Sequence, residues 1–600
     1  MSSRTTGRAS KLAAFFAALA LVAAACGGGD DDGDSSDTTA ATSETTAPAE
    51  EDGADDGADD GGDDGGDDAT EDTAGEGEIV EGEIEEDVVE ENTDPVQGGT
   101  LRYGLEADVD GINPTTSALS SPGLMMGNAV FDNLTAWPAE GTTAVPYLAE
   151  SVEPVDDTNT TWQVTLREGI VFHDGTPLNA EAVQVNFETQ RADPLVGLAV
   201  RPYYPETGAT EIIDELTIQY NLLDANAQFP GALAGQLGMI ASPTWLAAAL
   251  EDPSLNQAPV GTGPFIFESR NADSVTAFVR NDEWWNGEVF LDGIEFVPVT
   301  DPDTRVDLLF QGELDALQTS NPASVADLTS DDSIQNVVDE TGEESFAMIN
   351  TEVPPFDDIR ARQALALATP LENYRNLIGL GVSRGADQAF IPESPFYNPD
   401  VVQVGDDPDA AVALAAEYCG EFPDNCTDGK INTELQWSGP SVIQTRIAEL
   451  LDEGWSAAFN VTFDELPQDE HISQTATGQY NVVTWRQFGG VDPALDNVWL
   501  ECRTIGGISL NWPKFCDPER DALLLQAQNE TDPDVRAGLY QQVSQLINDS
   551  FAYIFLVHTT WDNAFAENVR GVCDRVAPDG TLLRCVTNGR TWHSSVWFAG

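Results

Sequence analysis

Apolar and polar residues alternate along residues 161–167 (TWQVTLR), so that Trp, Val and Leu fall on one face. Side chains of a β-strand point alternately to its two faces, and this pattern therefore predicts a half-buried strand. A similar alternation over 100–104 predicts a strand near the start of the folded part. Residues 170–172 (IVF) predict a further short strand after a Glu-Gly turn.

The stretch that follows raises the question of a catalytic or metal site, because a His stands next to an Asp. Residues 173–177 (HDGTP) have the composition of a turn, Asn179 is a candidate N-cap, and 180–190 read as a helix. No Ser or Cys nucleophile accompanies the pair in a recognisable elbow. We therefore expect His173 and Asp174 to be structural.

Strand and helix patterns mix in this way from residue 98 to the end of the 600-residue chain, which predicts an α/β protein with several lobes. The formal net charge is −80. Such a charge repels phosphate backbones and anionic membranes, so we expect no nucleic-acid partner.

The N-terminus has the pattern of an export signal. Arg4, Arg8 and Lys11 precede an apolar run over 12–25, which is too short for a comfortable membrane span. The segment resembles a bacterial lipoprotein signal, in which 1–25 is removed and Cys26 becomes the lipid-bearing first residue. Ala23 stands where such signals usually have Leu, and an ordinary signal peptide cut nearby is the alternative.

Residues 26–97 form a segment of different composition. Between residues 30 and 98 there are 29 Asp or Glu residues and no Lys or Arg. Such a segment buries too little apolar surface to offset the entropy of ordering, and we expect a disordered acidic tether. A calcium-binding repeat is the alternative, but the spacing gives no defined loop with a bidentate Glu.

Six cysteines follow Cys26, and an even number in an oxidising compartment indicates disulfide bonds. Six cysteines allow about fifteen pairings. Pairing between sequence neighbours is preferred because it closes short loops, and a zinc site is the alternative, disfavoured by the absence of a CxxC pair. The preferred pairs are Cys419–Cys426, Cys502–Cys516 and Cys573–Cys585.

Residues 162–183, with LREG and FHDGTPLNAEAV, closely resemble the signature of the family 5 extracellular solute-binding proteins, the peptide- and nickel-type receptors of ABC importers. Further segments match the family in the same order. They are 98–101 (GGTL), 112–114 (INP), 260–265 (VGTGPF), 281–285 (NDEWW), 312–315 (GELD), 354–365 (PPFDDIRARQAL) and 532–556.

The resemblance implies a two-lobed periplasmic-binding-protein fold of class α/β, with an extra third lobe, hinge crossings and a cleft between the lobes. Lobe I would comprise about 98–145, 262–345 and 550–600, lobe II about 146–261, and lobe III about 346–549, together the solute-binding domain 98–600. Solute capture would occur by lobe closure.

The resemblance also implies partners and a place in the cell. ABC permease and ATPase subunits and a peptide or small organic solute would be the partners of a monomer held outside the cytoplasm by its lipid alone. No enzyme activity, cofactor or metal is expected, because no nucleophile–base pair, phosphate-binding loop or ligand cluster is found. A ligand-sensing adaptor on the same fold and a secreted hydrolase are the alternatives.

The candidate ligand residues come mainly from 484–493 (TWRQFGGVDP). Family peptide receptors read the ligand's amino terminus with an Asp three residues after a Trp. Here Phe488 stands three residues after Trp485, and only an insertion brings Asp492 into line. Arg486 would instead pair with a carboxylate or phosphate, and Asp492 would point inward only if the loop is rearranged.

The missing Asp shifts the expected ligand from ordinary oligopeptides toward peptides with blocked amino termini, opines, glycosides or other anionic solutes. A surface salt bridge for Arg486 and core packing for Trp485 are the structural alternatives. Thr116 and Ser117, in an early loop, and Trp561, after the closing strand, are further candidates for the cleft.

Overall fold

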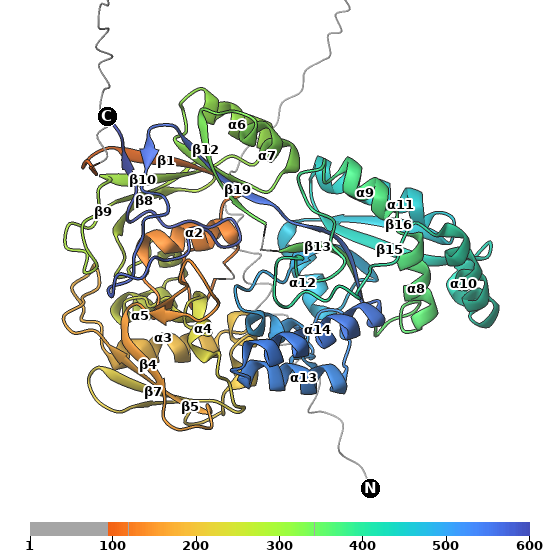
Figure 1. The fold of residues 1–600 in the computed structure, drawn as a ribbon, viewed down its shortest axis with the longest axis horizontal. Coiled ribbons are helices and arrows are strands. Elements are labelled where there is room, and N and C mark those ends of the chain that lie inside the picture. Colours follow the sequence, from red (N-terminus) through yellow and green to blue (C-terminus); the bar gives the residue numbers. More distant parts are fainter. Residues whose placement is uncertain (1–93, 118, 341–342) are drawn as a thin grey trace, which may run out of the picture. The chain divides into compact units, whose positions relative to one another are not determined.

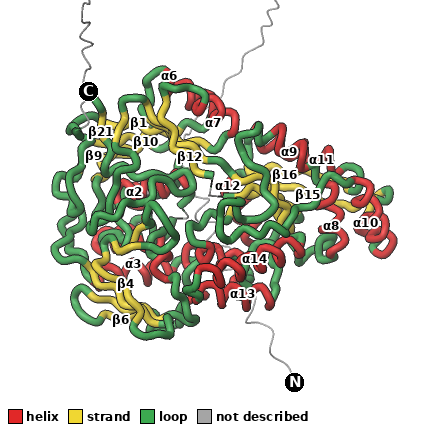
Figure 2. The backbone as a smooth tube through the Cα atoms, viewed as in Figure 1, coloured by secondary structure: helices red, strands yellow, loops and turns green. Residues whose placement is uncertain are grey.

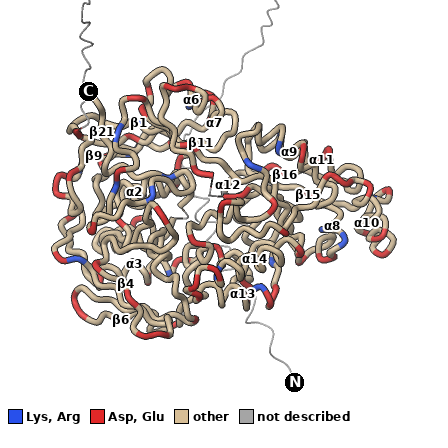
Figure 3. Tube along the Cα trace, viewed as in Figure 1, with Lys and Arg blue, Asp and Glu red and all other residues tan. Residues whose placement is uncertain are grey.

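The computed structural model describes residues 94–117, 119–340 and 343–600 (Figure 1). The predicted signal, Cys26 and nearly all of the acidic tether lie outside these residues. Among the described residues, no helix is long and apolar enough to cross a membrane. Asp and Glu are spread along the described chain, whereas Lys and Arg are few (Figure 3).

The first sheet is mixed and has the strand order β12-β19-β11-β1-β10-β9-β8 within the described residues. Only β1 runs parallel to its neighbours, β10 and β11. One face packs against α2 (Ser121–Val130) and the other against α6 (Pro302–Phe310) and α7 (Pro322–Thr329). The strands are β1 (Thr100–Leu105), β8 (Phe265–Asn271), β9 (Val275–Arg280), β10 (Gly293–Pro298), β11 (Ala316–Thr319), β12 (Ile334–Asp339) and β19 (Trp561–Ala566).

The second sheet is antiparallel, in the order β4-β5-β7-β6. Its strands are β4 (Ala149–Pro154), β5 (Thr161–Leu166), β7 (Thr217–Asn221) and β6 (Thr210–Ile212). Phe187 of α3 (Ala180–Ala192) packs edge-on against Tyr220 of β7, with the ring centroids 5.4 Å apart. The predicted strand at 161–167 and the predicted helix at 180–190 are confirmed, and Asn179 caps the helix by accepting from the Ala182 amide.

The predicted strand at 170–172 is wrong, because Val171 forms only an isolated bridge to Pro177. The turn itself is structural, as expected. His173 contacts the carbonyl oxygen of Gly263 through Nε2 at 3.0 Å, and Asp174 accepts hydrogen bonds from Ser242 and the Thr176 amide. Burial lowers the pKa of His173, so its ring stays neutral at physiological pH.

These contacts fasten the turn to a place where the chain passes between the first and second sheets. A Cβ on Gly261 would lie 2.0 Å from the Val130 carbonyl oxygen, and one on Gly263 would lie 2.7 Å from the Val130 carbonyl carbon. The two crossing segments therefore lie against each other, and only glycine permits that approach. This accounts for both glycines of the GTGPF sequence.

The third sheet has the order β14-β15-β17-β13-β18, with β16 paired to β15. Figures 1 and 2 show its strands flanked by helices, of which α8 (Ile359–Ala368), α10 (Pro408–Glu421) and α11 (Val442–Trp455) share one core and α13 (Pro518–Asn529) and α14 (Pro533–Ser550) another. The strands are β13 (Glu344–Ile349), β14 (Cys426–Thr427), β15 (Lys430–Ser438), β16 (Phe459–Leu466), β17 (Val482–Gln487) and β18 (Tyr553–His558).

The remaining elements are short or connect these sheets. They are α4 (Phe229–Ala232), α5 (Pro243–Glu251), α9 (Leu371–Leu377), α12 (Gln468–Thr477), the paired strands β2 (Thr135–Ala136) with β3 (Val145–Pro146) and β20 (Val569–Arg570) with β21 (Trp597–Phe598), and the 3₁₀ helices η1 (Val196–Leu198), η2 (Arg201–Tyr203), η3 (Gln236–Gly238), η4 (Pro253–Gln257), η5 (Pro423–Asn425), η6 (Pro493–Trp499) and η7 (Cys502–Thr504).

Strand β18 pairs with β13 of the third sheet, and the chain enters the first sheet only at β19. This crossing lies later in the chain than the expected boundary at about 550, and the lobe ranges otherwise stay a prediction. Strands β18 and β19 are both apolar and follow each other in the sequence, so their sequence does not show which sheet each one joins.

Disulfide bonds join Cys419 to Cys426, Cys502 to Cys516 and Cys573 to Cys585 among the described residues. These are the pairs that pairing between sequence neighbours predicts. Each closes a loop of 7 to 14 residues, which lowers the conformational entropy of the unfolded chain.

A buried carboxylate in the first sheet makes stability depend on pH. Asp562 is 0% exposed, its oxygens have no hydrogen-bond partner among the described residues, and burial raises its pKa to about 7. The pKa is about 3.9 in an unfolded chain, so the folded state holds a proton that the unfolded state loses. The stability from this group is full below pH 4 and is lost as the pH rises through 7.

Replacing Asp562 with Asn should therefore stabilise the protein relative to wild type by about 2–4 kcal/mol more at pH 8 than at pH 4. Urea unfolding at several pH values measures this difference. Asp157→Asn, at an exposed position, should change the free energy of unfolding by the same amount at every pH. A change that is likewise independent of pH for Asp562→Asn would contradict the burial argument.

Candidate functional site

Arg486 extends from β17 of the third sheet to the carboxyl ends of β1 and β11 in the first sheet. Its Nη1 donates a hydrogen bond to the hydroxyl oxygen of Ser320 at 2.8 Å. Nη2 lies 3.6 Å from a carboxylate oxygen of Glu106, and Nε lies 3.7 Å from one of Glu343. Ser320 follows β11, Glu106 follows β1 and Glu343 precedes β13. The guanidinium therefore contacts three separate chain segments.

The indole of Trp561, the first residue of β19, supports this guanidinium. The Arg486 guanidinium carbon lies 5.2 Å from the ring centroid, within the range of a cation–π contact. Gly589 also lies against this ring, with a φ of +68°, and an added Cβ there would approach a ring atom to 2.3 Å. Trp561 is 1% exposed and is therefore a fixed platform.

Burial lowers the pKa of Arg486, but the Glu343 and Glu106 carboxylates outweigh burial and hold it above the ordinary value. The side chain is still 39% exposed. Two carboxylates surround one guanidinium at distances too long for hydrogen bonds. Oε2 of Glu106 accepts a hydrogen bond from the Ser320 hydroxyl at 3.1 Å, whereas Oε2 of Glu343 has no hydrogen-bond partner among the described residues.

Two more ionisable side chains lie in the same neighbourhood. Burial raises the pKa of Asp496 to about 7, with the charge of Glu343 adding to the effect. Burial lowers the pKa of Arg590 to about 10, against the opposing charge of Glu343. With this pKa, Asp496 changes its charge near neutral pH.

Trp485, a predicted ligand residue, points to the opposite face of β17 from Arg486. Its ring centroid lies 4.5 Å from that of Trp512 and 5.1 Å from that of His471. Burial lowers the pKa of His471 to about 4, so the stack remains uncharged at neutral pH. Trp485 therefore packs in the core that α13 and α14 share, which is the structural alternative.

Phe488 is also a core residue, 5% exposed, and the structure does not bring it to the site. Its ring lies among those of Phe346, Tyr553 and Phe555, with centroids 5.3–6.3 Å away. The residue has a φ of +71°, which shows that the chain turns sharply where a family peptide receptor has Asp.

Asp492 forms a buried ion pair instead of pointing toward Arg486. Its two oxygens accept from Nη1 and Nη2 of Arg536, at 2.7 and 2.5 Å, and Oδ1 also accepts from the Ala494 amide at the start of η6. Asp492 is 1% exposed. The negative charge of Asp492 is thus already balanced by Arg536, and its carboxylate does not point toward the candidate ligand site.

The early loop with Thr116 and Ser117 contacts the chain segment that carries the second sheet, residues 149–260. Gln236 donates from its side-chain amide to the Ser117 carbonyl oxygen at 2.8 Å, and Ser117 is 7% exposed. The Thr116 hydroxyl is buried without a hydrogen-bond partner among the described residues. Of the predicted residues, Arg486 and Trp561 are brought together, whereas Trp485, Phe488 and Asp492 are not.

Sequence reasoning missed Glu106, Ser320 and Glu343. Glu106 and Ser320 each directly follow a strand, which is where ligand-contacting residues of α/β sheets gather. The sequence contains that signal. It does not reveal that β1 pairs with β11, which is what makes Glu106 and Ser320 neighbours.

The model of the bacterial extracellular solute-binding proteins, family 5, matches residues 143–503. The chain belongs to this family. The assignment confirms the predicted role as the extracytoplasmic substrate-binding component of an ABC importer.

Relatives cover most of the chain. The di/tripeptide-binding protein 2 of Pseudomonas aeruginosa is 26% identical over 79% of this chain and 92% of its own length. The heme-binding protein A of Haemophilus influenzae is 27% identical over 74% of this chain and 84% of its own.

A solved structure shows the same fold. The ABC transporter-associated periplasmic binding protein DppA from Helicobacter pylori, in complex with the peptide STSA, superposes with a TM-score of 0.73 at 20% identity. It covers 84% of this chain and 99% of that one. The predicted periplasmic-binding-protein fold is confirmed.

The Asp492–Arg536 pair should matter for stability. Replacing Asp492 with Ala leaves Arg536 buried and uncompensated, which should lower the free energy of unfolding by about 3–5 kcal/mol. Urea unfolding measures the loss. Glu421→Gln removes a carboxylate that is 61% exposed and pairs with Arg360, and should cost no more than about 1 kcal/mol. An equally small loss for Asp492→Ala would contradict the structural role.

Proposed function

We propose that the protein captures short peptides or peptide-sized solutes that carry a free amino group beside a carbonyl or carboxylate oxygen. The observation that carries this proposal is the placement of Arg486 between Glu106 and Glu343, where all three are partly exposed. The guanidinium supplies hydrogen-bond donors and the two carboxylates supply acceptors.

An unsatisfied oxygen favours a solute with an ammonium group. Glu106 and Glu343 both flank Arg486, and one oxygen of Glu343 is buried without a hydrogen-bond partner among the described residues. An ammonium bound to Glu343 would satisfy that oxygen, while Arg486 donates to the neighbouring carbonyl or carboxylate oxygen. In this proposal two glutamates replace the Asp that is missing after Trp485.

A purely anionic solute fits less well, although it is the ligand class that the missing Asp suggests. Its charge would meet Arg486 but would also face both carboxylates, which costs free energy. The names of a di/tripeptide-binding relative and of a structure holding the peptide STSA also support peptides.

The solute would bind between lobe I with lobe III on one side and lobe II on the other, and would favour the closed state by its differential affinity. The closed receptor would then deliver it to the permease and ATPase subunits as a monomer. Capture and release require no catalysis, so no enzyme activity is proposed. Cys26 and the acidic tether would hold the receptor at the outer face of the membrane.

Arg486→Gln and Glu343→Gln separate the two halves of this recognition. Calorimetric titration with a pool of free dipeptides and tripeptides, and with the same pool N-acetylated, supplies the measurement. We expect Glu343→Gln to weaken the free peptides about tenfold or more and the acetylated pool much less, because only the former carry the ammonium. Arg486→Gln should weaken both pools.

Arg360→Gln is the matched control, since Arg360 pairs with Asp358 and Glu421 away from the site. It should leave both affinities unchanged. Tighter binding of the acetylated pool to wild type would contradict an ammonium site at Glu343.

Lipid attachment has its own test. Cys26→Ser removes the thiol that would carry the lipid, so the variant should move from the membrane fraction to the soluble fraction after cell lysis. Fractionation and immunoblotting measure the shift. Continued retention in membranes would contradict the anchor.

A further inference from the structure

The second sheet is connected to the rest of the chain only through the first sheet. The chain enters β4 after α2 and β2, and it leaves the segment around 260 to form β8. It never passes directly from the second-sheet segment, 149–260, to the third sheet. Any contact between those two parts is therefore non-covalent, and it breaks when they separate.

Tyr203, Asp224, Glu501 and Arg503 make such a contact, which we call the seam cluster. The Tyr203 hydroxyl donates to Oε2 of Glu501 at 2.7 Å. Nη2 of Arg503 donates to Oε1 of Glu501 at 2.9 Å, and Nη1 pairs with Asp224. The Arg503 guanidinium lies over the Tyr203 ring at 5.0 Å from its centroid.

The seam cluster is charged and largely shielded from water. The Glu501 side chain is 1% exposed and that of Arg503 is 27% exposed. Hydrogen bonds between ionised groups are about twice as strong as neutral ones, and shielding strengthens them further. Opening the seam would leave Glu501 without the Tyr203 hydroxyl and Arg503 without Asp224.

A second set of contacts crosses the same seam at the end of α13. The Ala227 amide donates to the Gln528 carbonyl oxygen at 3.0 Å, and the Gln528 side chain donates to the Ala225 carbonyl oxygen at 3.0 Å. Asn159 donates to the side chain of Asn529 at 2.9 Å. Two neighbouring sites on the third-sheet side thus hold one face of the second-sheet segment.

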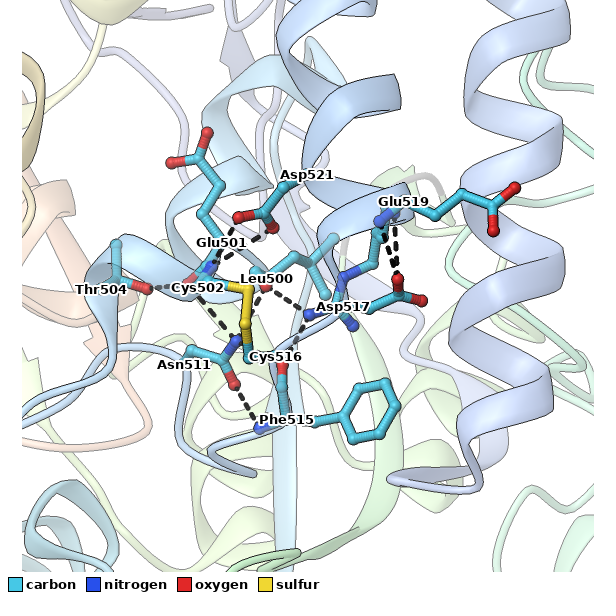
Figure 4. The surroundings of a disulfide bond; sticks show 11 residues. Leu500, Glu501, Cys502, Thr504, Asn511, Phe515, Cys516, Asp517, Glu519 and Asp521 are labelled. Atoms are coloured by element: carbon cyan, nitrogen blue, oxygen red, sulfur yellow. Dashed lines mark hydrogen bonds between the residues drawn. A yellow bond between two sulfur atoms is a disulfide. The ribbon is translucent and has the colours of Figure 1, made fainter.

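The disulfide Cys502–Cys516 joins these two sites (Figure 4). Cys502 stands between Glu501 and Arg503, and Cys516 precedes the start of α13 by two residues. Asn511, within the closed loop, donates to the carbonyl oxygens of Leu500 and Phe515 at 2.8 and 2.9 Å. The backbone that bears the seam cluster is thereby fixed to the helix that bears the second set of contacts.

The Cys502 amide adds one more restraint, donating to the Asp521 carboxylate in the first turn of α13 at 3.1 Å. Figure 4 shows Asp521 directed at this amide. The restraints on 500–504 thus come from the covalent bond, from Asn511 and from α13.

We propose that the seam cluster is a latch that sets how often the protein opens, with Arg503 and Glu501 as positioning residues kept in place by Cys502–Cys516. The contacts of the latch and those of Arg486 have no residue in common. The latch acts on the closed arrangement itself, and it therefore does not depend on which solute the proposed site binds.

Hydrogen–deuterium exchange of the solute-free mature protein tests the latch through the Ala227 amide, whose hydrogen bond crosses the seam. Fragmentation to single-residue resolution isolates this amide. Arg503→Gln should raise its exchange rate about tenfold or more, because charge-assisted bonds to Glu501 and Asp224 are lost. Tyr203→Phe should raise it less. The amides of β5 should be unchanged, which shows that the second sheet stays folded.

Arg360→Gln is the control for Arg503, and the double change Cys419→Ser/Cys426→Ser is the control for Cys502→Ser/Cys516→Ser. Only Cys502→Ser/Cys516→Ser should speed exchange at the Ala227 amide. Unchanged exchange in Arg503→Gln would overturn the latch. Equal acceleration by both double variants would overturn the specific role of Cys502–Cys516. Arg503→Gln and Tyr203→Phe still test the latch if a cysteine variant fails to fold.

Discussion

The site depends on the hydrogen bond and ion contacts of Arg486, because they join two sheets at one guanidinium. These contacts are possible because the first and third sheets are linked twice by short crossings, from β12 to β13 and from β18 to β19. Two short links restrict the relative motion of the parts they join. The second-sheet segment is linked only to the first sheet and contacts the third through the seam.

The junction of the first and third sheets and the seam therefore differ in how they are held together. The junction of the first and third sheets offers fixed donors and acceptors on a rigid indole platform, which is the preorganisation that recognition needs. The seam, by contrast, holds parts together without a covalent link and relies on charge-assisted bonds around Glu501 and Arg503. In the two proposals, recognition of a solute and persistence of the closed state would therefore depend on different residues.

Much of the fold could be predicted from the sequence because it is encoded locally. The alternation over 161–167, the cap at Asn179 and the short cysteine spacings each depend on neighbouring residues, and each appears in the structure. The strand expected at 170–172 does not form, because backbone bonds there close a turn from Phe172 to Thr176. The sheet to which β18 belongs is a long-range property that no local pattern reveals.

The site was less predictable for the same reason. The position after a Trp indicates Arg486, but Glu106 and Glu343 lie 380 and 143 residues away in sequence, and the sheet topology makes them its neighbours. Alignment with an expected carboxylate indicates Asp492. Its buried partner Arg536, 44 residues further along, decides its role, and nothing in the local sequence indicates that pair.

In the proposed function, two carboxylates and one guanidinium receive a solute with a free amino group. The sharpest test is native mass spectrometry of the protein purified from a complex lysate, followed by release of the bound molecules and labelling with an amine-specific reagent. We expect a set of short peptide masses that all gain the label. A single anionic species that takes no label would rule out an ammonium site.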